Sequence, residues 1–166
     1  IAGLERIIPE VIVYTQNVDG LHSTAGSSDV IEIHGNLHHL HCTHCRFATR
    51  VETYAGLGDP PLCPKCFAPV RPAVVLFGEA LPEAGVARLE AAFAEDFDIV
   101  FSIGTSSLFP YIVQPVLWAK ASGAATVEIN PAETVHSAHV DFHAAAGAAE
   151  AMGRIYRDHR VAGFNT

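Results

Sequence analysis

Residues 11–22, VIVYTQNVDGLH, place a short apolar run directly before a dense polar one. The first part, VIVYT at 11–15, is a continuous apolar segment of the kind that forms a strand buried on both faces of a sheet. The second part puts Gln16, Asn17 and Asp19 at the point where that strand ends. Ligands of parallel α/β sheets bind beyond the carboxyl ends of the strands. The stretch therefore predicts either an ordinary loop or one side of a ligand site.

Further segments along the chain have the character of strands and helices. The strand candidates are DVIEIHG (29–35), AVVLFGE (73–79), DIVFSIGTSS (98–107) and ATVEINP (125–131). The helix candidates are residues 81–96, 111–123 and 144–159. Strands that alternate with helices in this way predict an α/β fold with a parallel sheet.

The composition is that of a chain with enough apolar residues for a core and an excess of negative charge. Of 166 residues, 49% are hydrophobic and 17% are charged, which argues against disorder. The net charge of −8 disfavours nucleic acid and anionic membranes as main partners. No segment reaches the ~18 apolar residues of a membrane span, and no basic-then-apolar signal segment opens the chain. We therefore expect a cytoplasmic protein that binds neither nucleic acid nor membrane.

Four cysteines form two CxxC pairs, Cys42 with Cys45 and Cys63 with Cys66, which are separated by 17 residues. Two such knuckles place four thiolates around a zinc ion, and a closed set of four ligands makes that zinc structural. Two disulfides or four unligated thiols are the alternative, which a chain without a secretory signal disfavours. We interpret residues 37–72 as an inserted zinc-binding module. Four histidines crowd the first knuckle and are either ligands or solvated, and solvation is favoured because four thiolates already suffice: His38, His39, His41 and His44.

Polar groups also follow the other strand candidates. Gly104, Thr105 and Ser106 form a turn in which backbone and hydroxyl groups suit a phosphate. Asn130 follows the last strand candidate and suits a ribose hydroxyl. His34 follows VIEI, and its pKa range suits a general base, so it is either catalytic or an ordinary satisfied polar residue.

Taken together, these motifs resemble the sirtuins, a family of NAD-dependent protein lysine deacylases. The resemblance rests on motifs in the order YTQNVDGLH, EIHG, the two CxxC knuckles, RPAVVLFGEALP, GTSSLFP and VEIN. It covers nearly the whole chain from about Ile7, and the RPxVVxFGExLP form is most similar to bacterial-type members. It implies a Rossmann-like parallel sheet in two segments, 1–36 and 73–166, with the zinc-ribbon module inserted between them.

The resemblance also implies a role for individual residues. His34 matches the catalytic base, and Asn17 belongs to the same catalytic group. NAD would contact a set of residues at the strand ends: Gln16, Asn17, Val18, Asp19, Gly104, Thr105, Ser106, Asn130 and Ala146. The backbone of an acyl-lysine protein or peptide would pair with residues 74–79, in which we expect substrate contacts from Val74, Val75, Phe77, Gly78 and Glu79.

The implied reaction transfers the acyl group from lysine to ADP-ribose. Nicotinamide leaves C1′ of the ribose as the acyl oxygen attacks that carbon. His34 then takes a proton from a ribose hydroxyl, and the hydroxyl attacks the resulting imidate. The implied products are free lysine, nicotinamide and O-acyl-ADP-ribose, so the enzyme belongs to the deacetylase or desuccinylase type.

The chain departs from the family pattern at its beginning. The GAGxS and GIPxFR motifs, which follow the first strand of sirtuins, do not occur here, and the chain begins at Ile1 without an initiator Met. We therefore expect a partial sheet that lacks the first strand. A sheet without this strand leaves unpaired backbone groups, and its glycine loop normally cradles the pyrophosphate. We expect such a chain to be marginally stable and poor at binding NAD.

Two alternatives have different consequences. A zinc-ribbon binding module without catalytic activity predicts no dependence on NAD and no effect of His34→Ala. A metal hydrolase that uses the histidines at 38–44 predicts acetate release without NAD. Four thiolates on one metal argue against the hydrolase, because catalytic zinc keeps an open position.

Overall fold

The computed structural model describes residues 1–162, which divide into two compact units. The first, here called the cysteine unit, contains Ala2 and Leu4–Leu89. The second, the C-terminal unit, contains Ile1, Gly3 and the chain from Glu90 onward. Within residues 1–162, every helix is too short or too polar to span a lipid bilayer.

The cysteine unit begins with a small parallel sheet. A 3-10 turn, η1 (Leu4–Arg6), precedes β1 (Val13–Thr15), and α1 (Leu21–Thr24) leads to β2 (Val30–Glu32). β1 and β2 pair in parallel, with Val13 opposite Val30 and Thr15 opposite Glu32. The next residue after β2 is the fully buried Ile33, which anchors the strand end. This sheet puts the ends of β1 and β2 side by side.

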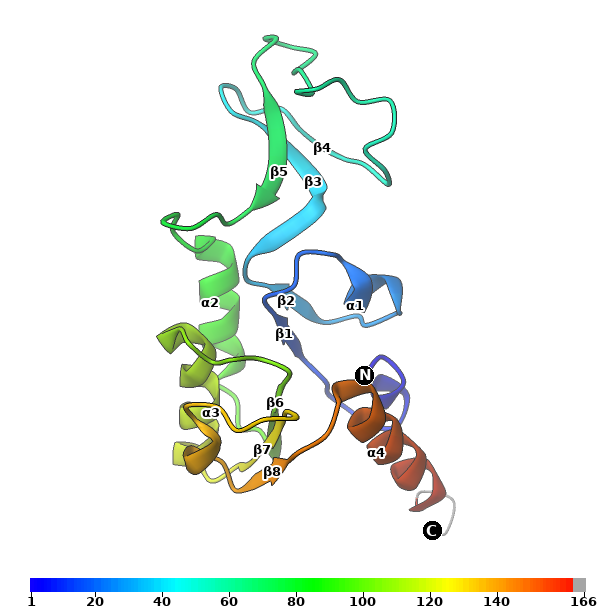
Figure 1. The fold of residues 1–166 in the computed structure, drawn as a ribbon, viewed down its shortest axis with the longest axis vertical. Helices are drawn as coiled ribbons and strands as arrows, with labels where there is room; N and C mark the ends of the chain where they lie inside the picture. Colours follow the sequence, from blue (N-terminus) through cyan, green and yellow to red (C-terminus); the bar gives the residue numbers. More distant parts are fainter. Residues whose placement is uncertain (163–166) are drawn as a thin grey trace. The chain divides into compact units, whose positions relative to one another are not determined.

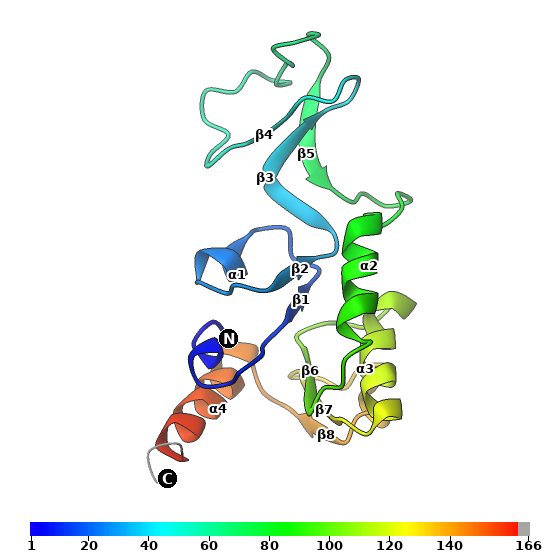
Figure 2. The same cartoon turned by 180° about the vertical axis from the view of Figure 1, so that it is seen from behind.

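The same unit continues into an antiparallel sheet of order β4-β3-β5, which is seen in Figures 1 and 2. Its strands are β3 (Gly35–Cys42), β4 (Ala48–Arg50) and β5 (Val70–Val74). The core under this sheet is small and consists of Leu40, Cys42, Cys63 and Val70. Two of its four members are cysteines, so the packing of the sheet depends on the cysteine cluster.

The C-terminal unit is built on a parallel sheet of order β6-β7-β8. Its strands are β6 (Ile99–Ile103), β7 (Ala125–Ile129) and β8 (Phe142–Ala144). α3 (Pro110–Ser122) connects β6 to β7 and packs against both, as Figure 2 shows. The buried side of α3 is apolar, with Ile112, Val116 and Ala119. The remaining elements are α2 (Glu83–Ala92), which begins in the cysteine unit, η2 (Ser137–His139) and α4 (Ala148–Ala162).

The structure confirms the parallel α/β prediction and corrects it at one strand. The parallel strands form two sheets, β1-β2 and β6-β7-β8. The candidate strand at 73–79 is wrong in extent and partners, because β5 ends at Val74 and runs antiparallel to β3. Its apolar run VVLF resembles a buried strand, yet Leu76 and Phe77 are exposed. The proposed boundaries 1–36, 37–72 and 73–166 remain a prediction beside the two observed units.

Candidate functional site

His34 lies two residues after the end of β2, beside the loop that follows β1. Its Nδ1 is 3.1 Å from the backbone oxygen of Gln16, and a carbonyl oxygen can only accept. Nδ1 therefore carries the hydrogen, and Nε2 carries the basic lone pair of the neutral ring. The backbone N–H of Val75 donates to the carbonyl of His34 at 2.9 Å. His34 is thus tied to the loop after β1 by its ring and to the segment after β5 by its backbone.

The loop after β1 is held by hydrogen bonds along its length. The N–H of Asn17 donates to the Thr15 hydroxyl at 3.1 Å, and the N–H of Leu37 donates to the Val18 carbonyl at 2.8 Å. Asp19 accepts from the N–H of Leu21 at 3.0 Å, two residues on, which is a local side-chain turn that leads into α1. The Asn17 side chain itself is exposed. This anchored backbone keeps the polar loop beside His34.

A buried asparagine, which sequence reasoning missed, fixes the chain just after His34. Asn36 is only 8% exposed. Its amide donates to the Glu32 carboxylate at 2.6 Å and accepts from the N–H of His38 at 2.8 Å. The signal for it was a polar residue in a strand that must pack one face on a core. Asn36 therefore locks the turn that carries His34 between β2 and β3.

The predicted substrate segment, residues 74–79, follows the last pairing of β5. Val74 lies opposite Gly35, and Val75 is half-buried. The side chain of Phe77 is completely exposed, at 100%, and that of Leu76 is 53% exposed. Gly78, at φ 87°, supplies the turn back toward the protein. An exposed backbone with apolar side chains at its tip is what a peptide can pair with.

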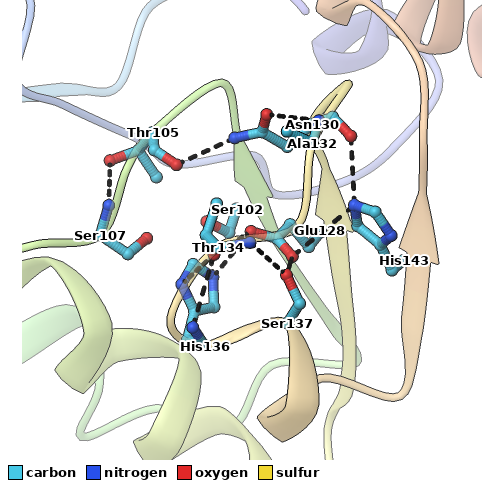
Figure 3. A network of polar contacts seen from close by, with 10 residues as sticks. All are labelled: Ser102, Thr105, Ser107, Glu128, Asn130, Ala132, Thr134, His136, Ser137 and His143. Carbon is cyan, nitrogen blue, oxygen red and sulfur yellow. Dashed lines mark hydrogen bonds and ion pairs between the residues drawn. The ribbon is translucent and has the colours of Figure 1, made fainter.

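In the C-terminal unit, Asn130 ties together the turns that end β6 and β7 (Figure 3). Its amide nitrogen donates to the carbonyl of Thr105 at 3.0 Å, and its amide oxygen accepts from the N–H of Ala132 at 3.2 Å. The Thr105 hydroxyl accepts from the N–H of Ser107 at 3.2 Å. His143 Nε2 lies 3.1 Å from the Asn130 carbonyl, to which it donates. The structure therefore brings Thr105 and Asn130 together.

The other predicted residues of this unit lie around the same turns. The N–H of Gly104 donates to Ile129 at 2.9 Å, and Ser106 is exposed. The N–H groups of Asn130 and Ala146 both donate to the carbonyl of Ala144, at 3.1 and 2.8 Å. Gly104 and Ala146 are thus linked through the ends of β7 and β8 to Asn130. The residues predicted to bind one ligand fall into two groups, each brought together within its own unit.

A buried carboxylate, also missed by sequence reasoning, lies beside the Asn130 turn (Figure 3). Glu128 is 1% exposed and accepts hydrogen bonds from the hydroxyls of Thr134, at 2.5 Å, and Ser137. Burial raises the pKa of Glu128, but the two hydroxyls, with His136 and His143 nearby, outweigh it and bring that pKa below its usual value. Burial lowers the pKa of His136. In the sequence, the indication of a buried carboxylate was a charged residue inside the apolar strand candidate at 125–131.

The four cysteines meet the geometric requirements of a zinc site. Their Sγ atoms all lie within 4.8 Å of one another, with Cys42 and Cys66 at 3.4 Å and Cys45 and Cys63 at 3.6 Å. A tetrahedral centre with ~2.3 Å Zn–S bonds places sulfur atoms about 3.8 Å apart. These separations are far longer than a disulfide bond of about 2.05 Å, which contradicts the disulfide alternative.

Backbone N–H groups also point at the sulfur atoms. The N–H groups of Cys45 and His44 donate to Cys42 Sγ, and that of Lys65 donates to Cys63 Sγ. The bond from Cys45 is the largest influence on Cys42 and, against burial, lowers the pKa of that thiol to about 6. This bond stabilises the thiolate form of Cys42, which is the form that binds zinc. Among residues 1–162 the histidines at 38–44 belong to no metal-holding cluster, and His38 Nδ1 instead donates to the Val51 carbonyl.

Comparison with known proteins shows which family shares these features. The model of the Sir2 family matches residues 1–110. NAD-dependent protein deacylase 2 of Pseudomonas syringae pv. tomato is 45% identical over 158 residues, which cover 93% of this chain and 64% of that protein. The NAD-dependent protein deacylase of Methylococcus capsulatus is 44% identical, with coverages of 92% and 62%. The chain therefore spans less than two thirds of the length of these relatives.

Solved structures give the same result at the level of the fold. A Sir2 homologue in complex with NAD superimposes with a TM-score of 0.90 at 37% identity, covering 97% of this chain and 62% of that one. A Sir2–p53 peptide–NAD complex superimposes with a TM-score of 0.85 at 29% identity, with coverages of 96% and 68%. These matches confirm the predicted Rossmann-like fold with its zinc-ribbon module.

Proposed function

The chain belongs to the Sir2 family, and we propose that it acts as an NAD-dependent protein lysine deacylase. In this proposal the acyl group of a lysine side chain passes to ADP-ribose, nicotinamide and the free lysine amine are released, and one water molecule is consumed. The acyl oxygen becomes the hydroxyl on C1′, and the water oxygen becomes the carbonyl oxygen of the new ester. The observation that carries it is the placement of His34, whose ring is held by Gln16 and whose backbone is bonded to Val75. One residue thus links the predicted NAD loop to the predicted substrate segment.

His34 acts as the general base. The Gln16 carbonyl keeps the hydrogen on Nδ1, so Nε2 is the atom that takes a proton from the ribose hydroxyl. NAD supplies the glycosidic bond whose cleavage drives the reaction. Asn17, Val18 and Asp19 bind and orient the nicotinamide end from the loop after β1. The anchoring of that loop at Thr15 and Leu37 supports this role, because a preorganised loop binds with less loss of entropy.

The remaining contacts to NAD come from the C-terminal unit. Gly104, Thr105 and Ser106 bind the phosphate and adenosine side, together with Asn130 and Ala146. The bond from Asn130 to Thr105 supports this assignment, because it gives the turn a fixed shape. The acyl-lysine peptide pairs with segment 74–79, and Val75 and Phe77 contact the aliphatic part of the lysine.

The protein also binds a structural zinc ion in this proposal. Cys42, Cys45, Cys63 and Cys66 hold it, and it stabilises the β4-β3-β5 sheet without taking part in the reaction. Four thiolates persist in a reducing compartment, which supports a cytoplasmic location. The net charge of −8 supports protein substrates over nucleic acid or anionic membranes.

Mass spectrometry of an acyl-lysine peptide tests the proposal. The purified protein is incubated with acetyl-, succinyl- and longer acyl-lysine peptides, with and without NAD. We expect deacylation only with NAD, in equal amounts with nicotinamide and O-acyl-ADP-ribose, and a loss of at least about 100-fold in His34→Ala. Acyl release without NAD would favour a metal hydrolase. No turnover with any acyl group, in a protein that keeps its zinc, would favour a zinc-ribbon binding module.

A further inference from the structure

We propose that Arg71 is a positioning residue, which acts through Glu79 to hold segment 74–79 in the shape that receives the acyl-lysine peptide. The proposal rests on the proposed function and adds to it a residue that does not touch the substrate. Arg71 lies in β5, three residues before that strand ends, and Glu79 closes the segment. We call this pair the Arg71–Glu79 clamp.

The clamp is a two-pronged ion pair. Arg71 Nη1 donates to Glu79 Oε1 and Nη2 donates to Oε2, both at 2.8 Å. The planar guanidinium matches a carboxylate in this geometry, which a lysine cannot reproduce. The side chains are 32% and 40% exposed, so the pair is only partly screened by water. The clamp therefore joins β5 to the far end of the segment with directional bonds.

The same two side chains also bind the backbone between them. Arg71 Nη2 donates to the carbonyl of Val74 at 2.9 Å. Glu79 Oε2 accepts from the N–H of Leu76 at 3.0 Å, and the N–H of Glu79 donates to the Leu76 carbonyl at 3.0 Å. The backbone on both sides of Val75 is thus fixed, while Phe77 at the tip remains fully exposed. A fixed backbone with an exposed tip is a preorganised surface for a peptide strand.

The geometry also connects the clamp to the proposed catalytic base. Val75, which lies inside the clamped segment, donates its N–H to the carbonyl of His34. Val74 lies opposite Gly35 in the β3–β5 pairing. A change in the shape of the segment is therefore transmitted to the backbone beside His34. Through this arrangement, Arg71 affects peptide binding without touching the peptide.

The clamp revises the role predicted for Glu79. Both of its carboxylate oxygens are bonded to Arg71, and one also accepts from Leu76. Hydrogen bonds from Arg71 and then from the Leu76 N–H lower the pKa of Glu79 to about 2, so the clamp stays charged at any pH of assay. Glu79 therefore serves the substrate site through the shape of the backbone.

Steady-state kinetics of clamp variants test the proposal. We compare wild type with Arg71→Gln and Glu79→Gln, and with Arg71→Lys, which keeps the charge but loses the fork. Arg50→Gln is the matched control, because Arg50 and Glu52 form a 3.5 Å pair whose side chains are 66% and 81% exposed. We expect the KM for an acetyl-lysine peptide to rise about tenfold in both Gln variants, with the KM for NAD within about twofold of wild type. Arg71→Lys should recover only part of the loss.

The outcomes separate this proposal from the proposed function. Wild type that turns over no acyl-lysine peptide with NAD contradicts the proposed function, and the clamp with it. Active wild type whose peptide KM is unchanged in both Gln variants overturns the clamp alone, and so does an equal rise of both KM values. If Arg71→Gln fails to fold, Arg71→Lys decides, because it keeps the positive charge and, unlike Glu79→Gln, changes no residue predicted to contact the substrate; an unchanged peptide KM in Arg71→Lys would then overturn the clamp.

Discussion

At Gly35 the backbone passes so close to the opposite strand that no side chain fits. Gly35 has φ 79°, and a Cβ built on it would overlap the carbonyl oxygen of Ala73 and lie 3.2 Å from the Cα of Val74. Left-handed backbone costs other residues about 1–2 kcal/mol, and the overlap adds to that. The close approach is what lets β3 pair with β5 directly after His34. The identity of one glycine thus fixes the position of the proposed base.

We predict that Gly35→Ala lowers the free energy of unfolding by more than about 2 kcal/mol, because the strained φ and the steric overlap add. Urea unfolding measures the change. Gly147→Ala is the control, since a Cβ built there meets no atom within 4 Å and its φ is not in the left-handed region. Equal stability of the two variants would contradict the role given to Gly35.

The buried Glu128 network leads to a second prediction. Glu128→Gln replaces an acceptor of two hydroxyl bonds by a group with only one acceptor atom, so we expect a loss of about 1–3 kcal/mol. The exposed Glu133→Gln is its control, for which we expect a change within about 0.5 kcal/mol. Chemical denaturation at neutral pH makes the comparison, and similar midpoints for both variants would contradict it.

The same network sets a direction for the dependence on pH. The pKa of Glu128 is below its unfolded value, so its contribution is present above about pH 4.5 and is lost as the pH falls toward the folded pKa. The pKa of His136 is lowered by burial, so protonation favours the unfolded state once the pH falls below about 6.5. We expect stability, measured by urea unfolding, to decline on acidification from pH 7, and the part of the decline below about pH 4.5 to be missing in Glu128→Gln.

Sequence reasoning succeeded at residues whose chemistry is local and failed at residues that act through packing. The position of His34 after a strand, beside a polar loop, followed from the alternation of apolar and polar runs. Asn36 and Glu128 did not, because a polar residue in a strand gives no sign of whether its partners will be protein or water. Arg71 was passed over for the same reason, since its partner Glu79 lies eight residues away across a turn.

At the level of elements, the antiparallel sheet around the cysteines is the part least predictable from sequence. Apolar and polar residues do not alternate regularly in the strand β3, GNLHHLHC. Its buried residues are Asn36, Leu40 and Cys42. Its core is completed by Cys63 and Val70, which are far along the chain. The cysteine spacing predicted the ligand cluster because two CxxC knuckles can place four thiolates around one metal ion in a compact arrangement. The strand order depends on side-chain packing, which the spacing of the cysteines does not determine.

We predict that removal of the metal unfolds this sheet. The protein should contain one zinc per chain, and a strong chelator should abolish the near-ultraviolet signal of the cysteine unit, since structural zinc binding is coupled to folding. Cys63→Ser should lose the metal. The exposed His44→Ala should keep it, because His44 lies in the first knuckle but is not among the ligand atoms. Zinc loss in His44→Ala would contradict the four-thiolate site, as would full zinc content in Cys63→Ser.

At the level of the whole molecule, the order of the motifs along the chain is sufficient to identify the family. Each motif meets a separate requirement of the backbone or of a ligand. An unrelated sequence would have to meet all six in the same order by chance. The division into units was not predicted. Only two residues separate β2 from β3, so the chain carries the β1-β2 sheet and the cysteine module in one unit. The positions of the motifs along the chain did not indicate that these two segments belong to one unit.

In the proposed reaction, acyl transfer to ADP-ribose begins with attack of the acyl oxygen on C1′, and His34 then activates the ribose hydroxyl. A peptide whose acetyl-lysine carries ¹⁸O in the amide carbonyl tests it directly by mass spectrometry with NAD present. We predict that the label appears on the ribose of the ADP-ribose product after its acyl group is removed, and that His34→Ala abolishes product formation. Label found in free acetate, with none in ADP-ribose, would show that the acyl oxygen does not attack C1′.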